Sequence, residues 1–149
     1  MITVIQRVSK ASVSVEGVVI SSIGKGLLVF AGLEKEDGKT DTAYTLKKIN
    51  ELRIFEDSEG KMNRSIIDTA GELLVVSQFT LAGNIHKGRR PGFDNAMEPQ
   101  TAQKMFDDFV NELSKTVQSV KTGRFGAHME VSLINNGPVT FIIDSRKRI

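Results

Sequence analysis

Apolar and polar residues alternate along the first third of the chain with the period of a half-buried β-strand. The alternation is clearest over residues 11–16, and Gly17 then permits a turn. Two further apolar runs, 18–23 and 27–33, are separated by Gly24-Lys25-Gly26. Because each run is short and ends in turn residues, we predict strands that are joined mainly as hairpins.

Two segments have the spacing of helices. Thr40 is a favoured type of N-cap residue. The apolar residues that follow it at helical spacing, and so predict a short helix, are Ala43, Leu46 and Ile49. A longer helix starts near Pro99, since proline is favoured in a first turn. Its apolar stripe consists of Ala102, Met105, Phe106, Phe109, Val110, Leu113 and Val117. Such a stripe is typical of a helix that covers a sheet, so we interpret Met105, Phe106 and Phe109 as core rather than as a ligand site.

The remaining pattern is again that of strands. Residues 53–60 read as an extended segment followed by a turn, and residues 73–77 form a short apolar strand. Alternation returns at residues 129–133, and residues 139–143 form the last predicted strand. Because no strand–helix–strand rhythm is apparent, we predict an α/β protein of the α+β type, a mainly antiparallel β-barrel or sandwich with two helices packed on it. A length of 149 residues fits a single domain spanning residues 1–149.

The composition excludes several classes of protein. The chain is 40% hydrophobic and 26% charged, as ordinary globular proteins are. It contains no cysteine, which excludes disulfides, thiolate nucleophiles and cysteine-bound zinc and fits a reducing compartment. Its longest apolar stretch is far shorter than the ~20 residues of a membrane-spanning helix, and no leader-like segment is found. We therefore expect a cytoplasmic protein with no membrane partner.

Two groups of polar residues lie at the ends of predicted strands. The first group comes directly after the apolar run 73–76 and consists of Ser77, Gln78, Phe79 and Thr80. The second, Asn135-Asn136-Gly137-Pro138-Val139-Thr140, places a Gly-Pro step between two strand-like stretches. Proline cannot donate to a sheet ladder, so it indicates an edge, a bulge or a turn, with a trans peptide as the default. Together the two groups predict an active site.

The side chains available for chemistry are few. Neither His86 nor His128 has a partner at metal-ligand spacing, so a metal site has weak support. A Ser-His-Asp triad stays open, because its members can come from distant positions, but neither Ser77 nor Thr80 lies in a GxSxG turn. Hydroxyls, backbone N–H donors and the substrate's own groups remain. These groups suit acyl transfer or ester cleavage, in which stabilisation of the oxyanion is often the largest effect.

Basic residues cluster twice, although the formal net charge is only +2. His86-Lys87-Gly88-Arg89-Arg90 lies in a long loop, residues 82–96, and Arg146-Lys147-Arg148 forms a second run. Either run could meet phosphates, and either could equally be solvated surface. The length of the loop indicates a functional or mobile segment.

Six groups of residues occur in the order that one family shows. They are Gln6-Arg7-Val8, Arg53-Ile54-Phe55 with Gly60-Lys61-Met62-Asn63, the segment from Ser77 to Leu81, Arg90-Pro91, Thr122-Gly123-Arg124-Phe125 and Gly137-Pro138-Val139-Thr140. On these residues the chain resembles the D-aminoacyl-tRNA deacylases over nearly its whole length. One such motif alone is weak, but six in the right order are specific.

The resemblance implies an editing hydrolase that cleaves the ester between a D-amino acid and the terminal adenosine of tRNA, acts as a homodimer and needs no metal or other cofactor. It also implies that the adenosine and ester site is lined by Ser77, Gln78, Phe79 and Thr80, with the backbone amides of Phe79 and Thr80 near the scissile carbonyl. No base is evidently paired with Thr80, so we favour oxyanion stabilisation with help from the ribose 2′-hydroxyl, while Thr80 positions water or substrate. The alternative is that Thr80 only satisfies a strand end.

The resemblance further implies that the Gly137-Pro138 peptide is cis and reaches into the partner subunit's pocket, where its carbonyls hold the α-ammonium group of the substrate. Enantiomers carry identical groups, so handedness must be read by geometry, and a glycyl ester should pass. Arg7 is the candidate for bracing this loop, although a surface position would suit it nearly as well. Phe125 and Met129 are candidates for lining the mouth. The candidates for binding tRNA phosphates are Lys87, Arg89 and Arg90.

Three places depart from the family pattern. His128 and Asn136 stand where aspartate is common, and residues 83–87 replace a more acidic loop. The loss of acids raises the local positive potential, which affects the expected tRNA preference more than the expected reaction. Two other functions stay open: a non-catalytic RNA-binding barrel, and a small-molecule esterase that uses the same hydroxyl pocket.

Overall fold

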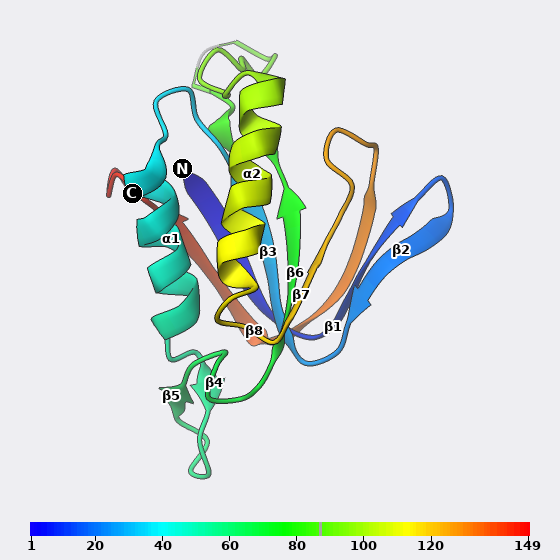
Figure 1. Cartoon of the computed structure of the whole chain (residues 1–149), viewed down its shortest axis with the longest axis vertical. Coiled ribbons are helices and arrows are strands. Elements are labelled where there is room, and N and C mark those ends of the chain that lie inside the picture. The colour runs from blue at the N-terminus through cyan, green and yellow to red at the C-terminus, as the bar shows by residue number, and fades with distance from the viewer. Residues whose placement is uncertain (87) are drawn as a thin grey trace.

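The computed structural model describes all residues except Lys87. One main sheet and two α-helices make up most of the chain (Figure 1). The strands of the main sheet are β1 (Ile2–Val15), β2 (Val18–Ile23), β3 (Gly26–Gly32), β6 (Glu72–Ser77), β7 (Ser119–Thr122) and β8 (Glu130–Asp144). The other elements are α1 (Lys39–Glu51), the small hairpin β4 (Phe55–Glu56) and β5 (Met62–Arg64), the 3-10 helix η1 (Phe79–Ala82) and α2 (Pro99–Leu113).

The strand order is β2-β1-β3-β6-β7, and β8 lies along the other side of β1. Strand β1 is antiparallel to β2, β3 and β8. In the described sheet β1 and β2 form a hairpin, but β2 and β3 both pair with β1 and not with each other, so the predicted second hairpin was wrong. Strands β3, β6 and β7 are parallel, because α1 lies in the crossover from β3 to β6 and α2 in the crossover from β6 to β7. The sheet is therefore mixed, and the prediction that no strand–helix–strand unit is present was wrong. Strand β7 has only four residues, too few to show a period in the sequence.

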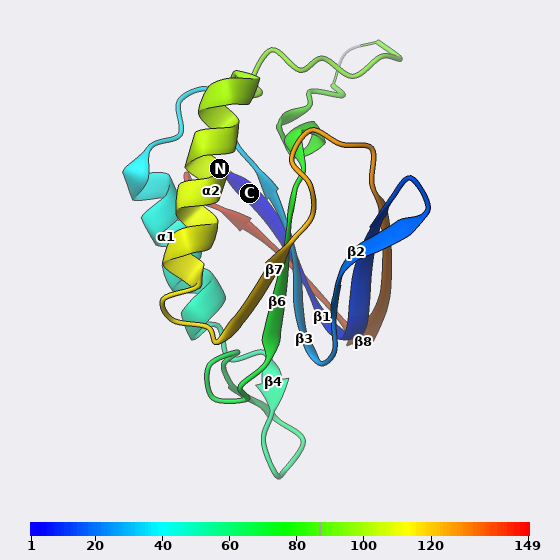
Figure 2. The same cartoon turned by 45° about the vertical axis from the view of Figure 1, so that its right-hand side comes forward.

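The sheet curls into a nearly closed, barrel-like form (Figure 2). The first half of β1 pairs with β3 and the second half with β2, while β8 follows β1 along most of its length. Both helices lie on one face of the sheet (Figure 1). The core beneath them includes Ile5, Leu27, Val29, Ile49, Leu73, Val75, Phe106, Phe109 and Leu113. A second core fills the curl and includes Val8, Val13, Ile23, Leu28, Leu74 and Val76.

The two predicted helices are present, and one of them begins differently from the prediction. In α2, Pro99 occupies the first turn and the side chain of Glu98 caps the backbone N–H groups of Gln100 and Thr101. The interpretation of Met105, Phe106 and Phe109 as core is confirmed, since both phenylalanines are buried and Met105 packs against the core cluster. Helix α1 starts one residue before Thr40, and its N-cap is Gly38. No helix in the described part of the chain is long and apolar enough to cross a membrane.

Strand β8 is continuous where the sequence predicts two strands. Its pairing with β1 steps from Val8 opposite Asn135 to Gln6 opposite Thr140. The four residues from 136 to 139 therefore face a single residue of β1, Arg7, and form a bulge. The Gly-Pro step lies in this bulge, in agreement with the edge, bulge or turn that proline indicates.

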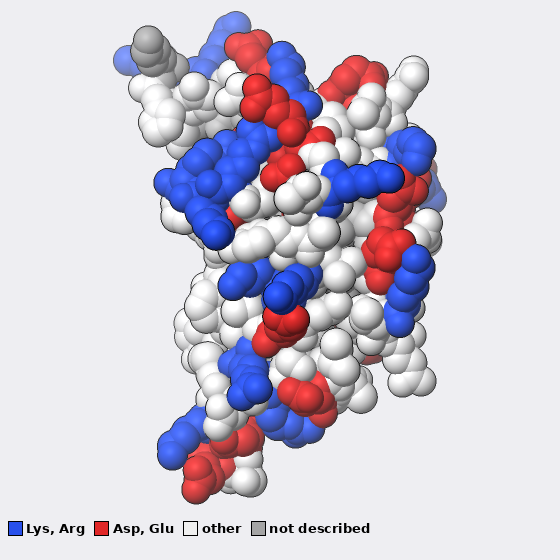
Figure 3. Space-filling view, turned by 60° about the vertical axis from the view of Figure 1, so that its left-hand side comes forward, with Lys and Arg blue, Asp and Glu red and all other residues white. Residues whose placement is uncertain are grey.

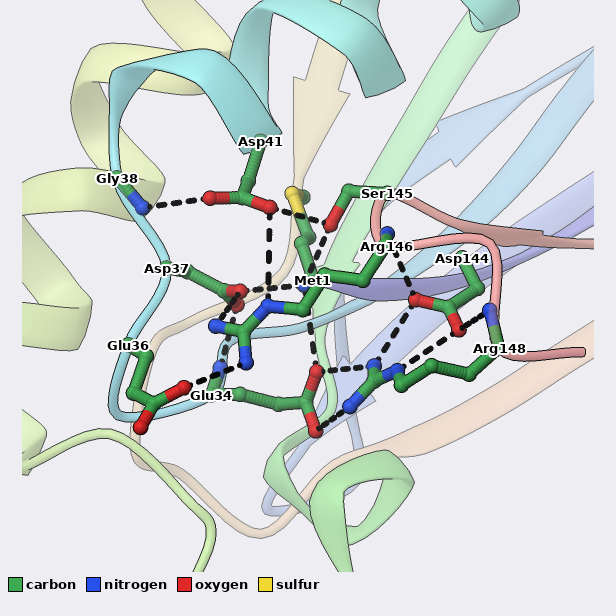
Figure 4. Close-up of polar contacts among 10 residues, drawn as sticks. All are labelled: Met1, Glu34, Glu36, Asp37, Gly38, Asp41, Asp144, Ser145, Arg146 and Arg148. Carbon is green, nitrogen blue, oxygen red and sulfur yellow. Dashed lines mark hydrogen bonds and ion pairs between the residues drawn. The ribbon is translucent and has the colours of Figure 1, made fainter.

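A cluster of ion pairs fixes the segment that follows β8 (Figure 4). Arg148 donates to both carboxylate oxygens of Asp144 at 2.9 Å and to Glu34 at 2.5 Å. Arg146 donates to Asp37 at 3.0 Å. Polar groups of Met1, Glu36, Asp41 and Ser145 complete the cluster. Because Glu34 and Asp37 lie between β3 and α1, the cluster ties the last residues of the chain to that connection.

Candidate functional site

A pocket of about 590 Å³ opens at the carboxyl end of β6. Its walls come from three parts of the chain: the end of β6, the segment that leads into α2, and the connection from β7 to β8. The principal lining residues are Ser77, Gln78, Phe79, Phe93, Ala96, Met97, Glu98, Ala102, Phe125, His128, Met129 and Val131. Most of these side chains are apolar, with a few polar groups among them, as is usual in small-molecule sites.

The segment from Ser77 to Thr80 is positioned by the pairing of β6 with β3. Ser77 pairs with Ala31, and the next N–H group, of Gln78, donates to the carbonyl of Ala31 at 2.8 Å. The chain then turns into η1 and passes directly over Gly32. A Cβ atom at Gly32 would lie 2.7 Å from the Cβ of Leu81 and 2.9 Å from the carbonyl oxygen of Gln78. No side chain fits there, so Gly32 allows the turn to pack closely on β3.

The hydroxyl of Thr80 accepts a hydrogen bond from the side-chain amide of Gln78 at 2.6 Å. An amide cannot remove a proton, and among the described residues no basic group is found within hydrogen-bond distance of this hydroxyl. The N–H groups of Phe79 and Thr80 open η1, so they have no acceptor within that helix. Two backbone donors and one exposed hydroxyl therefore stand together beside the pocket.

Aromatic side chains form one wall of the pocket. The rings of Phe79 and Phe93 pack edge to face with their centres 5.0 Å apart, and both are substantially exposed. Phe93 belongs to the long loop, which is closed by the pairing of Asn84 with Gly92. Just after the loop, the N–H of Met97 donates to the carbonyl of Leu33, the residue that follows β3. Phe93 was not among the site residues predicted from the sequence. An aromatic residue inside a long basic loop was the signal that could have indicated it.

Two lining residues can carry a charge, Glu98 and His128. The N–H groups of Thr101 and Gln100 donate to the Glu98 carboxylate and lower its pKa, so this group caps α2 and is a weak base. His86 lies elsewhere, exposed in the long loop. Among the described residues, no group of three or more His, Asp or Glu side chains could hold a metal ion.

The bulge in β8 is held firmly although Gly137 and Pro138 are exposed. Arg7 donates through Nε to the carbonyl of Asn136 at 2.9 Å and through Nη1 to the carbonyl of Ile54 at 2.7 Å. The side chain of Arg7 is 6% exposed, which excludes the surface position that the sequence left open. The Gly137-Pro138 peptide is cis. Asn136 enters this arrangement through its backbone, so the departure from aspartate leaves the contact with Arg7 intact.

Asn135 closes the base of the same bulge. Its side-chain oxygen accepts the N–H of Val139 at 2.8 Å, and its amide nitrogen donates to the hydroxyl of Thr140 at 2.9 Å. Both residues lie on β8 on the far side of the Gly-Pro step. Asn135 belongs to the motif that was identified in the sequence, but its bracing role was not predicted.

The structure brings together part of the predicted site. Ser77, Gln78, Phe79, Phe125 and Met129 line one pocket, with Thr80 next to them on η1. The residues that do not line it are Arg7, Gly137 and Pro138, since the bend of β8 lies at the lower end of the sheet in Figure 1 and the carboxyl end of β6 at the upper end.

The predicted phosphate-binding residues lie on the long loop. Arg89 and Arg90 are exposed, and Lys87 lies outside the described residues. Elsewhere the charges are mixed: Figure 3 shows Lys and Arg side chains interleaved with Asp and Glu over one face of the molecule. The loop therefore carries both positive charge and a residue of the pocket wall, because Phe93, three residues after Arg90, lines the pocket.

A family model described as D-Tyr-tRNA(Tyr) deacylase matches residues 4–144. The chain belongs to this deacylase family. A D-aminoacyl-tRNA deacylase of Thermodesulfovibrio yellowstonii is 54% identical over 98% of this chain and 100% of its own length. A protein of the same name from Persephonella marina is 56% identical over 98% of this chain and 99% of its own length.

Solved structures agree with the deacylase fold. A structure named c-Myc DNA Unwinding Element Binding Protein is 41% identical, covers 97% of this chain and 98% of its own, and superposes with a TM-score of 0.92. A structure described as a probable eukaryotic D-amino acid tRNA deacylase covers 95% of this chain and 97% of its own with a TM-score of 0.80, and at 19% identity it supports the fold alone. The family resemblance drawn from the six motifs is confirmed.

Proposed function

We propose that this chain hydrolyses the ester that joins a D-amino acid to the terminal adenosine of tRNA. The observation that carries the proposal is the family match over residues 4–144, which includes the segment Ser77 to Thr80 beside the pocket. The curated relatives that match the chain over almost their whole length carry the name of this activity. Since aminoacyl-tRNA is made where translation takes place, the proposal fits a cytoplasmic location.

The pocket suits the terminal nucleoside of such a substrate. Its volume of about 590 Å³ falls within the usual range for small-molecule sites. Phe79, Phe93 and Phe125 offer apolar surface to a flat base, and stacking of a base on an aromatic ring contributes about 1–3 kcal/mol. An adenosine held there would place its ribose and ester toward Ser77 and Thr80.

The reaction needs stabilisation of the oxyanion and delivery of water. The free N–H groups of Phe79 and Thr80 supply donors for the oxyanion, and one such donor contributes about 3–4 kcal/mol in other enzymes. Thr80 lacks a paired base, so its hydroxyl positions water or substrate while the ribose 2′-hydroxyl assists the proton transfers. The amide of Gln78 fixes the orientation of the Thr80 hydroxyl.

Selection of the D configuration would come from a second copy of the chain. The β8 bulge that carries Gly137 and Pro138 lies at the other end of the sheet from the pocket of its own chain, which supports a role in the pocket of a neighbouring chain. Strand β8 pairs with β1 along one edge, and near the bulge it exposes Ile134, Phe141 and Ile142. A symmetric homodimer formed along β8 would cover these apolar side chains and carry each bulge toward its partner.

The carbonyls of the inserted bulge would hold the α-ammonium group of the substrate, with backbone crowding where an L side chain points. An apolar pocket discriminates one methyl group by only about 1–3 kcal/mol, so rigid geometry is required. Glycine has no side chain to reject, so mischarged glycyl-tRNA would also be cleaved. Arg89 and Arg90, with Lys87 in the same run, would meet phosphates of the acceptor end.

Incubation of the protein with D-Tyr-tRNA and L-Tyr-tRNA in parallel tests the proposal. Release of tyrosine from the D substrate alone, in direct proportion to enzyme concentration, is the expected result. Binding of both tRNAs without release would support the non-catalytic RNA-binding barrel. Equal cleavage of both, together with cleavage of simple amino-acid esters, would support the small-molecule esterase.

A further inference from the structure

The sulfur of Met129 occupies a tight notch in the turn that joins β7 to β8. It accepts a hydrogen bond from the backbone N–H of Arg124 at 3.3 Å. A Cβ atom at Gly123 would lie only 2.6 Å from this sulfur. The N–H of Ala127 donates to the carbonyl of Arg124 at 3.2 Å and completes the turn. The sulfur therefore organises the turn, and the space between it and the backbone is filled.

This turn forms one wall of the pocket. Phe125 and His128 lie within it and line the pocket, and Met129 lines the pocket as well. Met129 is half-buried and packs against the core inside the curl of the sheet. A small oxidant that enters the pocket can reach the thioether, while the backbone contacts of the sulfur connect any change there to the shape of the wall.

The chain offers an oxidant no thiol, because it contains no cysteine and five methionines. Met1 is fully buried, and Met97, which also lines the pocket, is 8% exposed. Met62 is 48% exposed, but it lies on the small hairpin formed by β4 and β5, away from the pocket. Met129 is thus the pocket methionine that an oxidant reaches more readily, and Met62 is an internal reference for exposure.

We propose that Met129 is a reversible oxidation site at which hydrogen peroxide lowers the deacylase activity, an inference that rests on the function proposed above. The sulfur lone pair attacks one peroxide oxygen, the O–O bond breaks as the S–O bond forms, and the other oxygen leaves as water after proton transfer. The sulfur loses two electrons and the peroxide gains them. Methionine sulfoxide reductases reverse the change.

Oxidation makes the sulfur a chiral centre, so the sulfoxide oxygen can take either of two positions, one in each epimer. In one epimer the oxygen lies between the sulfur and the N–H of Arg124, where an ordinary N–H···O bond of about 2.9 Å would push the sulfur away from the backbone. In the other epimer it points into the apolar pocket and adds a polar group to the wall. The first epimer displaces the wall that faces the nucleoside, and the second makes that wall polar.

The test follows oxidation and activity in the same samples. The protein is treated with graded hydrogen peroxide, the sulfoxide at each methionine is measured by peptide mass mapping, and kcat/KM is measured with D-Tyr-tRNA. The expected loss is about tenfold at full oxidation of Met129. It should follow the Met129 sulfoxide fraction rather than the Met62 fraction, and both reductases together should restore activity.

Variants separate Met129 from the other methionines. Met62→Leu should lose activity in peroxide as the unchanged protein does, whereas Met129→Leu should keep its own starting activity. Met129→Gln, which introduces a polar oxygen without peroxide, should have lowered activity from the outset. Full oxidation of Met129 without loss of activity, or equal fractional losses in Met129→Leu and the unchanged protein, would overturn the proposal. A chain that never cleaves D-Tyr-tRNA would instead overturn the proposed function, and the map of sulfoxides would still test the reactivity of Met129.

Discussion

The guanidinium of Arg7 donates to the carbonyl oxygen of Asn136 at 2.9 Å, from the one β1 residue that lies opposite the β8 bulge. A second donor of the same guanidinium binds the carbonyl of Ile54 at 2.7 Å. Arg7 therefore joins three separate parts of the chain through main-chain groups, which fixes the position of the Gly-Pro step. The contact explains how an exposed loop can have a defined shape.

The first prediction concerns this contact. Arg7→Lys removes the planar fork and leaves at least one buried carbonyl without a donor, so we expect the free energy of unfolding to fall by about 1–3 kcal/mol. The kcat/KM for D-Tyr-tRNA, measured well below the melting temperature, should fall further than a small unfolded fraction explains. Arg53→Lys, at an exposed position before β4, is the matched control and should change neither quantity. Unchanged activity in Arg7→Lys would remove the bracing role.

The second prediction concerns Gly137. Its φ is +141°, and an added Cβ would lie 2.5 Å from a methyl group of Val139 and 3.1 Å from Nη2 of Arg7. Gly137→Ala must therefore move the bulge, and we expect loss of D-Tyr-tRNA cleavage with a folded chain by circular dichroism.

Mixing variants then tests whether the site is shared. If the bulge of one chain serves the pocket of its partner, Gly137→Ala mixed with Gln78→Ala produces dimers that contain one intact site. Random exchange of equal amounts should restore about a quarter of the normal activity, because half of the dimers are mixed and each has one working site of two. A mixture no more active than its components would place the bulge and the pocket in independent roles.

The sequence predicted elements with a clear apolar period and missed those that depend on distant partners. The second half of β1 and helix α2 lie where the pattern places them, because their periodicity reflects burial of one face. The parallel pairing of β3, β6 and β7 was missed, since the order of strands depends on the crossovers rather than on any local pattern. The cap of α1 was wrong because Thr40 and Gly38 are both acceptable residue types and packing decides between them.

The candidate site shows the same division. Motif residues at the end of β6 could be identified in the chain, since polar groups after a buried strand are unusual. Phe93 was missed, because a loop residue has no period and its aromatic character in a basic loop was the sole local signal; its place at the pocket depends on the hydrogen bonds at Gly92 and Met97. The burial of Arg7 was equally hidden, because it follows from the register of β8 on β1. The separation of Pro138 from the pocket of its own chain is likewise a property of the whole sheet.

The third prediction distinguishes two roles for Thr80. Thr80→Val keeps the shape of the side chain and removes the hydroxyl, so a positioning role predicts a loss of about tenfold in kcat, the effect of one hydrogen bond of about 1–1.5 kcal/mol. A D-Tyr-tRNA that ends in 2′-deoxyadenosine should be cleaved at least about a hundredfold more slowly, because the assisting hydroxyl is absent. Thr80→Ser should remain close to the unchanged enzyme. Complete loss in Thr80→Val with normal cleavage of the deoxy substrate would identify Thr80 as the nucleophile instead.

The fourth prediction concerns the basic loop. Arg89 and Arg90 are exposed on the loop that also carries Phe93 of the pocket wall, so Arg89→Gln with Arg90→Gln should weaken binding of tRNA. The slope of log K against log salt concentration should become shallower by about 0.7–0.9 for each phosphate that the variant no longer neutralises. Lys104→Gln removes a charge on the exposed face of α2, where Lys104 already pairs with Asp108, and should leave the slope unchanged. The same slope in all three proteins would assign the arginines to plain surface.

The last prediction concerns acid stability and depends on the cluster in Figure 4. Hydrogen bonds from Arg148 hold the pKa of Asp144 far below its ordinary value and also lower the pKa of Glu34. A carboxyl whose pKa is depressed by folding contributes stability that is complete above its unfolded pKa, about 4, and is lost as the pH falls toward the folded pKa. The free energy of unfolding should therefore be level near pH 7 and decline steadily below about pH 4.

Asp144→Asn separates this effect from general acid denaturation. The Asp144 side chain is 1% exposed and that of Arg148 is 42% exposed, so loss of the charged hydrogen bonds should cost about 1–3 kcal/mol at pH 7. The decline below pH 4, measured by urea unfolding at several pH values, should be shallower than in the unchanged protein because one depressed carboxyl is gone. Asp108→Asn, which removes an exposed ion pair with Lys104, is the control and should retain the original slope. If Asp144→Asn kept that slope too, the acid sensitivity would have to arise from carboxylates outside the Arg148 cluster.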